Sequence, residues 1–324
     1  MNTAIVTGAY GYIGSVLCKL LKQESYFVIG VDNDKRSSED WVKGKKRVQY
    51  CDDYLNEDFA SANFNRVLKQ NKDATVFHLA ANSLLGPSAT EPLMYYDNNT
   101  AKTLHLIGEL APTNKFIFAS TAAVYAETDR VVKETSRIDP PNNYGRSKLW
   151  CEQILDSYYE LGHIRAASFR FFNVIGALDD VGQLPETPHI VNQLCDRAMK
   201  KQPFTLNGDD YPTDDGTCVR DYLHVVDVCR ALIHADKYLH DKESCHHKFN
   251  LGSQHGYSVK QIVDCFRENC SDIDIRVGPR RIGDPPFLVA NPNKFIKQTG
   301  FKYQHSDNLK NMIISAWEYR NARF

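Results

Sequence analysis

The chain has 324 residues, with 39 lysines and arginines against 40 aspartates and glutamates, so its formal net charge is -1. This balance excludes a global field that would favour nucleic acid or an anionic membrane as a partner. The segment from Met1 to Gly8 lacks the basic region and long apolar core of a signal peptide, and no apolar run approaches the length of a membrane span. The nine cysteines contain no Cys-x-x-Cys pair, so we expect reduced thiols and a cytoplasmic protein.

The chain opens with the pattern strand, glycine turn, helix. Residues 4–7 read as a buried strand, and an apolar-periodic helix runs on to Leu21. Between them, Gly8 permits a tight turn, Gly11 lets the backbone approach a pyrophosphate, and Gly14 lets the helix pack close to the strand. In this context the glycines predict a dinucleotide site.

The second strand, residues 27–31, ends at Asp32, about twenty residues beyond the glycines, where a carboxylate can accept both hydroxyls of the adenosine ribose. An acid at this point disfavours a 2'-phosphate, so we predict NAD, although Lys35 and Arg36 follow closely. A third strand is predicted over residues 48–51. The acids after it, Asp52 and Asp53, either cap the next helix or meet the adenine amino group.

Strands and helices continue to alternate as far as residue 173. The predicted elements are a helix over 57–70, a strand over 74–81, a helix over 94–110, a strand over 115–119, a helix over 144–161 and a strand over 166–173. This order predicts an α/β protein with a Rossmann-type, doubly wound parallel sheet. His78, inside a strand, is expected to be a satisfied core histidine.

The pattern changes after residue 173. Proline, glycine and aspartate become frequent over residues 179–216, and a helix is predicted over 190–200. We therefore predict an NAD-binding domain over 1–173, joined by some later segments, and a smaller mixed α/β substrate-binding region over 174–324. Cys245-His246-His247 is the one local cluster that resembles metal ligands, but adjacent histidines point in different directions on any regular element, so we expect no metal.

Tyr144 and Lys148 lie four residues apart and therefore share one face of their predicted helix. A phenol has a reference pKa of about 10, so acting as a base near neutrality requires a shift of roughly three units, or about 4 kcal/mol. A neighbouring ammonium supplies part of this shift, and an oxidised nicotinamide ring can supply more. Thr121, just after the strand over 115–119, places a hydroxyl at the same edge of the predicted sheet.

Several stretches resemble the extended short-chain dehydrogenases/reductases, and within them the UDP-glucose (UDP-galactose) 4-epimerases. Those that mark the superfamily are residues 7–15, 95–99, 116–125 and 144–148, whereas residues 208–225 and 279–284 are more specific to the epimerases. The resemblance covers nearly the whole chain.

The resemblance implies an NAD that stays bound while the sugar is oxidised and reduced again at C4. Tyr144 would take the proton of the C4 hydroxyl, Lys148 would hold the nicotinamide ribose and lower the phenol pKa, and Thr121 would hydrogen-bond the same hydroxyl. The implied cofactor residues are Gly8, Gly11, Tyr12, Ile13, Gly14, Asp32, Asn33, Asp52, Leu79, Ala80, Asn98, Lys148 and Phe172. The implied UDP-sugar residues are Thr121, Tyr144, Asn173, Arg220, Arg281 and Asp284. The helices over 94–110 and 144–161 imply a homodimer by the same resemblance.

The chain departs from the family pattern at four places. Ser83 stands where many epimerases have a lysine near the cofactor, and Asn207 stands where an aromatic residue commonly meets the uracil. Residues 186–189 differ from the usual segment that lines the substrate site. Leu288 aligns with a position where a tyrosine narrows the sugar pocket in some members, so we hypothesise room for an N-acetylated sugar.

Three alternatives remain open. A nucleotide-sugar 4,6-dehydratase is disfavoured because Ala122 and Ala123 follow Thr121 where such enzymes place an Asp-Glu pair. A UDP-pentose 4-epimerase would differ only in the shape of its pocket. A non-catalytic NAD-binding sensor or scaffold would keep the fold, but retention of Thr121, Tyr144 and Lys148 counts against it.

Overall fold

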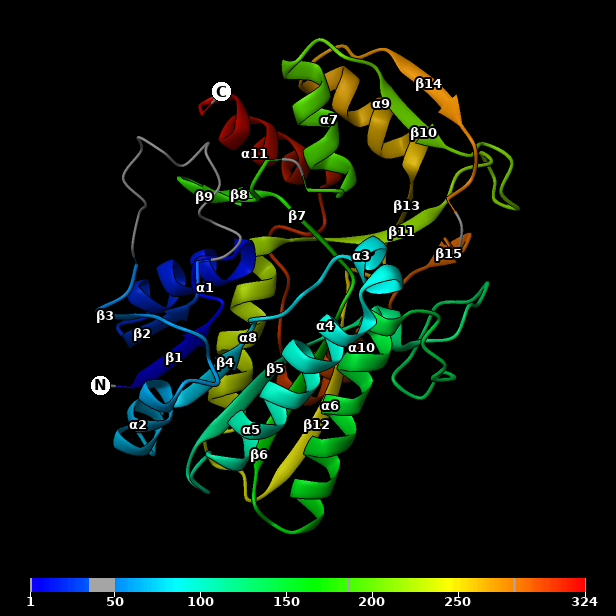
Figure 1. Ribbon diagram of the computed structural model, residues 1–324. Helices are drawn as coiled ribbons and strands as arrows, with labels where there is room; N and C mark the ends of the chain where they lie inside the picture. Colours follow the sequence, from blue (N-terminus) through cyan, green and yellow to red (C-terminus); the bar gives the residue numbers. More distant parts are fainter. Residues whose placement is uncertain (1, 35–49, 186, 282–283, 324) are drawn as a thin grey trace. The chain divides into compact units, whose positions relative to one another are not determined.

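The computed structural model describes residues 2–34, 50–185, 187–281 and 284–323, and the chain divides into two compact units (Figure 1). The first unit comprises Met1–Val124, Pro140–Arg170 and Cys229–Phe249. The second comprises Tyr125–Asp139, Phe171–Val228 and Asn250–Phe324. Within the described residues, no helix is both long and apolar enough to cross a bilayer.

The first unit is built on a seven-stranded, mostly parallel sheet in the order β12-β6-β5-β4-β1-β2-β3. The strands are β1 (Thr3–Thr7), β2 (Phe27–Asp32), β3 (Asp53–Asn56), β4 (Thr75–His78), β5 (Lys115–Thr121), β6 (Arg165–Phe171) and β12 (Cys245–Leu251). The register pairs Thr7 with both Val31 and His78, and Asp32 with Asn56. The carboxyl ends of β1, β2, β3 and β4 therefore form one edge, which is where doubly wound sheets bind their ligands. The predicted Rossmann-type fold is confirmed.

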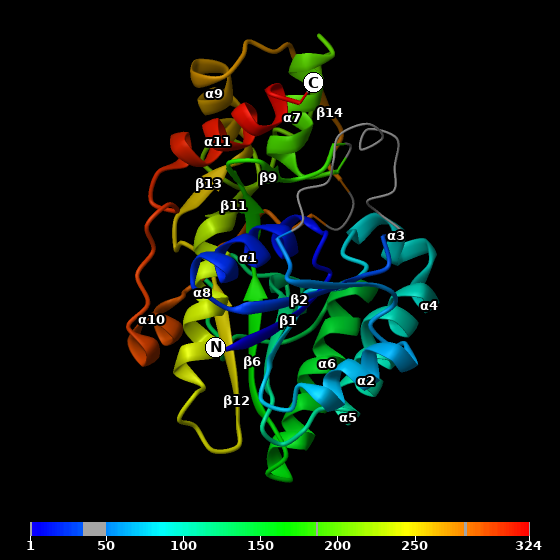
Figure 2. The ribbon, with the colours of Figure 1, turned by 90° about the vertical axis from the view of Figure 1, so that its left-hand side faces the viewer.

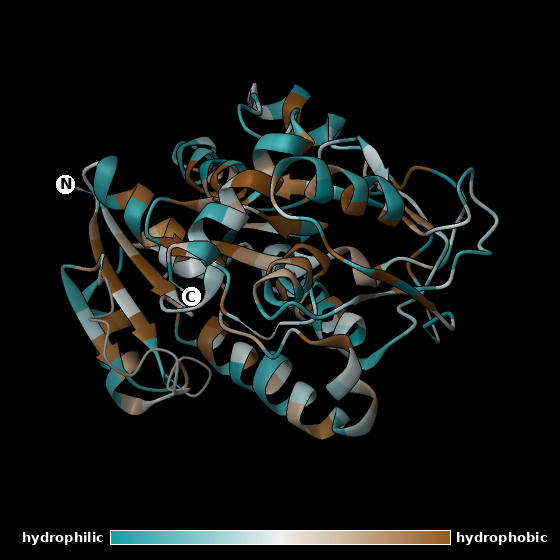
Figure 3. Ribbon diagram, turned by 90° about the horizontal axis from the view of Figure 1, so that it is seen from above, coloured by the Kyte–Doolittle hydropathy of each residue, from teal (hydrophilic) through white to brown (hydrophobic). Residues whose placement is uncertain are grey.

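Helices cover both faces of this sheet (Figure 2). The helices α2 (Ala62–Gln70), α5 (Lys102–Gly108) and α6 (Asn143–Glu160) lie on one face, and α1 (Tyr12–Gln23) and α8 (Val225–Tyr238) lie on the other. Successive side chains of a strand point to opposite faces of a sheet. On the face that α5 and α6 cover, Ile5, Val76 and Phe116 of the strands share a buried cluster with Leu106 of α5 and Leu155 of α6. Figure 3 shows that the strands are mostly apolar, in brown, whereas the helices carry polar segments, in teal.

The segment predicted as one helix over 94–110 is three elements. It consists of α4 (Pro92–Tyr95), a π-helical turn (Tyr96–Ala101) and α5, and a short helix α3 (Leu85–Thr90) precedes them. A π-helical turn adds a residue to the helical ladder, so it rotates the side chains that follow relative to a regular helix. Asn98 and Asn99 lie inside this turn.

The third strand is displaced from its predicted position. Residues 50 and 51 carry no strand, residues 48 and 49 lie outside the described part, and β3 begins only at Asp53. The following helix also begins later than predicted, at Ala62, because the Ser61 hydroxyl accepts the Phe64 amide 3.1 Å away and caps it. The prediction was therefore wrong by about one strand length here, which changes where Asp52 lies.

In the second unit, β11 (Val219–His224) joins three short strands. It pairs antiparallel with β13 (Gly256–Ser258) and parallel with β15 (Phe287–Leu288) and β7 (Asn173–Ile175). Two further pairs are β10 (Phe204–Asn207) with β14 (Ile275–Gly278), and β8 (Ala177–Leu178) with β9 (Val181–Gly182). The helices α7 (Ile190–Met199), α9 (Val259–Asn269) and α11 (Leu309–Asn321) share a buried apolar cluster, and α10 (Asn293–Thr299) is a separate short helix.

Candidate active site

The glycine turn after β1 is built so that only glycine fits. Gly8 has a φ of +72°, and a Cβ there would lie 2.9 Å from the Ala80 amide nitrogen. A Cβ on Gly14 would overlap the Gly8 carbonyl oxygen. The start of α1 is thus pressed against the turn, and a side chain at either glycine would force the two apart.

The first turn of α1 offers backbone amides to an anion. Gly11 is the N-cap, in an extended conformation, and it has no side chain to accept the amides of the first helical turn, which holds Tyr12, Ile13 and Gly14. A helix N-terminus of this kind suits phosphate groups, because its backbone N–H groups and its dipole both favour negative charge. The cradle therefore fits the diphosphate of a dinucleotide.

Asp32 ends β2 at the same edge, followed by Asn33. Its carboxylate accepts the amides of Tyr10 and Asp34, each at 3.0 Å. These bonds hold the carboxylate next to the glycine turn, since Tyr10 lies between Gly8 and Gly11. A carboxylate fixed here suits a ribose diol better than a 2'-phosphate. Lys35 and Arg36, which could have favoured NADP, lie outside the described residues.

Asp52 does not lie where the sequence placed it. Its carboxylate accepts the Val28 amide at 2.8 Å and pairs with Lys22 at 2.5 Å, so it lies at the beginning of β2. The edge that carries Gly8 and Asp32 is at the other end of that strand. The proposed adenine contact is therefore wrong, because β3 begins after Asp52 rather than ending before it. The acids near the carboxyl end of β3 are Glu57 and Asp58, and Asp58 pairs with Lys102 at 2.6 Å.

The segment after β4 returns to the glycine turn. The amide of Leu79 donates to the Thr7 carbonyl oxygen at 3.2 Å, and that of Ala80 donates to the Thr7 hydroxyl at 3.3 Å. Both residues are half-buried. They therefore line the edge of the sheet beside Gly8, and their contact with the cofactor stays a prediction.

Asn99 is a residue that the sequence reasoning missed in favour of Asn98. Its side-chain oxygen accepts the Asn82 amide at 2.8 Å, and its side-chain nitrogen donates to the Asn82 carbonyl oxygen at 2.9 Å and to the Ser147 hydroxyl at 3.1 Å. Asn98 donates to the Asn99 side-chain oxygen at 3.2 Å. Asn99 thus joins the loop after β4 to the residue before Lys148. The only signal for Asn99 in the sequence was that it forms a polar pair with Asn98 inside a predicted helix.

Tyr144 lies in the first turn of α6, which begins where the sequence predicted. The Asn142 side chain accepts the Gly145 amide at 2.8 Å and caps the helix. The half-buried Tyr144 ring lies edge-on to the Tyr95 ring, with centroids 6.4 Å apart. Because Gly145 has no Cβ, this turn packs directly on the Ala123 carbonyl, two residues after Thr121. The α6 turn and the end of β5 are therefore neighbours.

Lys148 is almost entirely buried, with 2% of its surface exposed. Its ammonium lies 4.6 Å from the centre of the Phe118 ring, and among the described residues no hydrogen bond or ion pair reaches it. Burial lowers its pKa to about 8. A buried ammonium needs hydrogen-bond acceptors, and the two hydroxyls of a ribose would supply them. Lys148 therefore fits the nicotinamide ribose of a bound NAD.

His78 is the core histidine that the sequence predicted. It is fully buried, and its ring nitrogens lie 2.8 Å from the Thr7 hydroxyl and 2.9 Å from the Thr103 hydroxyl. Burial, and then the nearby charge of Lys148, hold its pKa well below the usual range. It is therefore neutral and adds no second cation beside Lys148.

A buried charge network fixes α6 against the sheet one turn beyond Lys148. The Glu152 carboxylate accepts two hydrogen bonds from Arg170 of β6, at 3.0 and 2.7 Å, and one from the Ser120 hydroxyl at 2.5 Å. Glu152 and Arg170 are 0% and 3% exposed. Since Ser120 precedes Thr121 in β5, the network sets the helix of Tyr144 and Lys148 in register with the strand of Thr121.

The predicted UDP-sugar residues of the second unit gather around β11. Arg220 pairs with Asp284 at 3.1 Å, and Asn173 donates to the Asp221 carbonyl oxygen at 3.1 Å. Arg281 is exposed, and its carbonyl oxygen accepts the Asp284 amide at 3.2 Å. The paired Arg220 and Asp284 thus put a guanidinium next to a carboxylate, an arrangement that suits a ligand carrying both phosphate and hydroxyl groups. Phe172, also in this unit, is buried.

Two of the four departures from the family pattern belong to the strands around these residues. Leu288 lies in β15 and pairs with Arg220, while Asn207 is the exposed end of β10. His189 is the N-cap of α7, and Glu186 lies outside the described residues. Ser83 is half-buried in the loop after β4.

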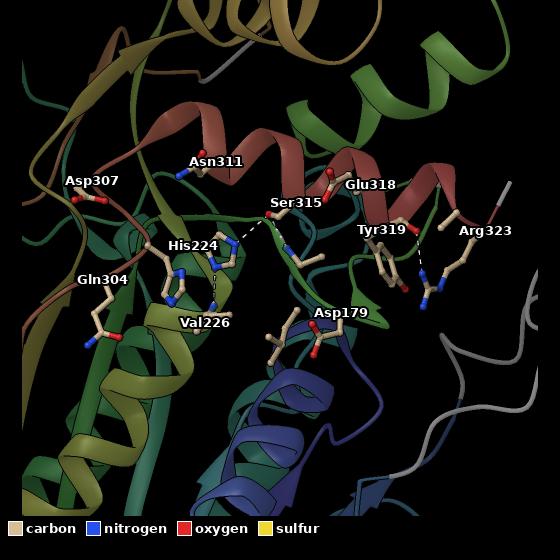
Figure 4. Close-up of a pocket in the computed structure, with 14 residues that line it drawn as sticks. Asp179, His224, Val226, Gln304, Asp307, Asn311, Ser315, Glu318, Tyr319 and Arg323 are labelled. Carbon is tan, nitrogen blue, oxygen red and sulfur yellow. Dashed lines mark hydrogen bonds between the residues drawn. The ribbon is translucent and has the colours of Figure 1, made fainter.

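The second unit also contains a polar pocket of about 470 Å³, with His224, Ser315, Glu318 and Asp179 around it (Figure 4). The His224 ring accepts the Val226 amide at 3.2 Å and contacts the Ser315 hydroxyl at 3.0 Å. Burial, and then the neighbouring His305, lower the His224 pKa to about 4. None of the residues predicted to bind NAD or the UDP-sugar lines this pocket.

Comparisons with known proteins agree with this geometry. The model of the NAD dependent epimerase/dehydratase family matches residues 4–252. The chain belongs to this family. Among its relatives, a UDP-glucose 4-epimerase of Corynebacterium glutamicum is 35% identical, over 98% of this chain and 95% of the relative.

Solved structures of epimerases extend the family likeness to nearly the whole chain. A UDP-glucose 4-epimerase from Stenotrophomonas maltophila, solved with bound NAD and formylated UDP-arabinopyranose, matches with a TM-score of 0.90 and 30% identity over 99% of this chain and 98% of that one. The UDP-Glc/GlcNAc 4-epimerase of Campylobacter jejuni matches with a TM-score of 0.81 and 30% identity, over 99% and 100% of the two chains.

Proposed function

We propose that the chain is an NAD-dependent UDP-sugar 4-epimerase that interconverts UDP-galactose and UDP-glucose. The observation that carries the proposal is the placement of Tyr144 and Lys148 on one helix that packs against the end of the Thr121 strand, where the buried Lys148 has no partner among the described residues. The full-length relatives named UDP-glucose 4-epimerase support the same reaction. The glycine turn, Asp32 and Lys148 suit NAD as the cofactor.

In the proposed reaction Tyr144 is the base. Its phenolate takes the proton of the sugar C4 hydroxyl, while the Thr121 hydroxyl donates a hydrogen bond to the same oxygen. Lys148, held over Phe118, binds the nicotinamide ribose and favours the phenolate by its charge. NAD, when bound, would supply the acceptor and then the donor of the C4 hydride. Tyr144 then gives its proton back to the new C4 oxygen, and C4 is inverted if the ketone has presented its other face.

The two units divide the remaining tasks. The first unit holds the cofactor through Gly8, Gly11, Tyr12, Ile13, Gly14, Asp32, Asn33, Leu79, Ala80 and Asn98. The second holds the UDP portion through Asn173, Arg220, Arg281 and Asp284. Arginine forks bind diphosphate oxygens in fixed geometry, so the nucleotide is gripped firmly while the sugar is free to turn.

A homodimer is part of the proposal. Apolar side chains stay exposed on α4, α5 and α6 in the first unit: Leu93 of α4 is 80% exposed, Leu104 of α5 43%, Trp150 of α6 41% and Leu161, the C-cap of α6, 68%. Monomeric proteins rarely leave so many large apolar groups in water along neighbouring helices. We also propose a cytoplasmic location, on the reasoning that an unpatterned set of cysteines suits a reducing compartment.

Turnover of UDP-galactose without added NAD tests the proposed function. The purified protein should convert UDP-galactose to UDP-glucose, because the cofactor is regenerated in every cycle. A 4,6-dehydratase would release a dehydrated keto sugar instead, and a sensor or scaffold would leave the substrate unchanged. Either result would overturn the proposal.

The range of sugars is a narrower question, and Leu288 is the residue that bears on it. Leucine is smaller than tyrosine, so we propose that UDP-N-acetylgalactosamine also fits. Leu288→Tyr should reduce turnover of that substrate while sparing UDP-galactose, by about tenfold or more in relative kcat/KM. Wild-type protein that shows no turnover of the N-acetylated sugar would end this part of the proposal, and a UDP-pentose 4-epimerase would reveal itself by preferring UDP-arabinose.

A further inference from the structure

The thiols of Cys18 and Cys51 lie in contact beside α1, the helix that follows the glycine turn. Cys18 lies on α1, one turn after Gly14, and is 1% exposed. Cys51 lies just before β3 and is partly exposed. Their sulfur atoms are 3.8 Å apart and share a hydrogen bond. A disulfide needs a separation of about 2 Å, so the two sulfur atoms have to approach each other further when they are oxidised.

The surrounding residues hold this pair together. Asp52, next to Cys51, pairs with Lys22 of α1 at 2.5 Å, and Lys22 lies one turn after Cys18. The same Asp52 exchanges two hydrogen bonds with the backbone of Val28, both at 2.8 Å. The segment that carries Cys51 is therefore fixed against α1 on one side and against β2 on the other.

The absence of a side chain at Gly30 makes room for the Cys51 sulfur. A Cβ at Gly30 of β2 would lie only 2.5 Å from that sulfur atom. The Cys51 thiol thus fits into a gap in the strand and is directed at Cys18 rather than away from it. Cys229, a third buried thiol near Cys18, instead donates to the Ile13 carbonyl oxygen at 3.5 Å.

The chemistry of the pair assigns each thiol a part. The hydrogen bond with Cys18 is the main cause that lowers the Cys51 pKa, and the Lys22 ammonium adds to it. The same contact and burial raise the pKa of Cys18. Cys51, the more exposed residue of the two, therefore also has the thiol with the lower pKa, which is the arrangement of an attacking and a resolving cysteine.

We propose that Cys18 and Cys51 form a site of reversible disulfide modification that ties α1 to the start of β3. The oxidant is a small-molecule disulfide such as oxidised glutathione. The Cys51 thiolate attacks one of its sulfurs and releases one thiolate, giving a mixed disulfide. Cys18 then loses its proton and attacks the Cys51 sulfur, which releases the second thiol. The protein loses two hydrogens, one small disulfide becomes two thiols, and a dithiol reverses the change.

A peptide map of the whole protein tests the site. The purified chain is incubated with oxidised glutathione, its free thiols are alkylated, and it is digested without reduction. The expected product is one Cys18–Cys51 linked peptide, which disappears after treatment with dithiothreitol. Cys51→Ser should abolish it and Cys245→Ser, a matched change at a half-buried cysteine, should not. Lys22→Met should slow its formation.

The map also contains the results that would overturn the site. Stable glutathione on Cys51 without the linked peptide would show that Cys18 cannot resolve it. A Cys51 that stays unreacted, or a linked peptide that joins Cys18 to Cys229, would equally contradict the assignment. Because Cys18 is buried, the peptide map of Cys18→Ala is interpreted only if this variant unfolds at the same temperature as the wild type. If it does not, Cys51→Ser alone decides the test.

Discussion

The ammonium of Lys148 lies 4.6 Å from the centre of the Phe118 ring, and burial lowers its pKa to about 8. This charge is kept out of water without an anionic partner from the described residues. Such a group destabilises the nucleotide-free protein while it is protonated. Bound NAD, through its ribose hydroxyls, would give the charge its missing acceptors.

The Lys148 charge predicts a pH dependence of stability. Because the folded pKa of about 8 is below the ordinary lysine pKa of 10.5, the unfolded chain holds a proton between these values that the folded chain has lost. Stability from this group therefore rises with pH across that window, by roughly 3 kcal/mol in total. Lys148→Met should lack the rise. The measurement is the difference in unfolding free energy between nucleotide-free wild type and variant from pH 7 to pH 10, and a constant difference would contradict it.

Tyr144→Phe should remove most of the epimerisation while leaving bound NAD in place. The variant keeps the ring that packs against Tyr95 but loses the hydroxyl that moves the proton. We expect turnover to fall by about a hundredfold or more, since general-base catalysis contributes factors of that size. NAD content is read from the absorbance of the released nucleotide. Unchanged turnover would exclude Tyr144 as the base.

Glu152→Gln should destabilise the first unit and displace α6. The change leaves the Arg170 guanidinium buried without its charge partner, which costs roughly 3–5 kcal/mol. The exposed Glu160, on the same helix, is the control, and Glu160→Gln should leave the unfolding free energy unchanged within about 0.5 kcal/mol. If both variants unfold alike, the network does not hold the helix. Chemical denaturation followed by circular dichroism distinguishes these cases.

Gly14→Ala should weaken retention of NAD more than it weakens the fold. The added methyl would overlap the Gly8 carbonyl oxygen and push α1 away from the turn. Overpacking of this kind costs about 1–3 kcal/mol. Gly86→Ala is the control, because nothing lies within 4 Å of a Cβ there. NAD content after gel filtration should fall in the first variant alone, and equal contents would contradict the role of the turn.

Local sequence signals predicted the parts of the site that depend on local structure. Glycine spacing identified the turn of Gly8 and Gly14, and the four-residue spacing of Tyr144 and Lys148 placed both on α6. These features follow from backbone sterics and helical geometry, which act within a few residues. The burial of His78 was predicted for the same reason, since it lies inside an apolar strand.

Tertiary structure decided what the sequence could not. No element was predicted over residues 53–56, yet they form β3 because they pair with Ile29 to Asp32. This displacement moved Asp52 from the cofactor edge to the Lys22 ion pair. The role of Asn99 depends on a π-helical turn that no residue pattern announces. The contact between Cys18 and Cys51 joins residues 33 positions apart, so their separation along the chain gave no reason to pair them.

The fate of the C4 hydrogen tests the central claim most directly. UDP-galactose carrying deuterium at C4 is mixed with UDP-galactose whose sugar carries carbon-13 and no deuterium, and the mixture is converted by the purified protein without added NAD. The account predicts UDP-glucose with its deuterium still at C4, and no deuterium in the carbon-13 sugar or in water. Loss of the label to solvent, or its transfer between molecules, would contradict an oxidation and reduction completed on one retained cofactor.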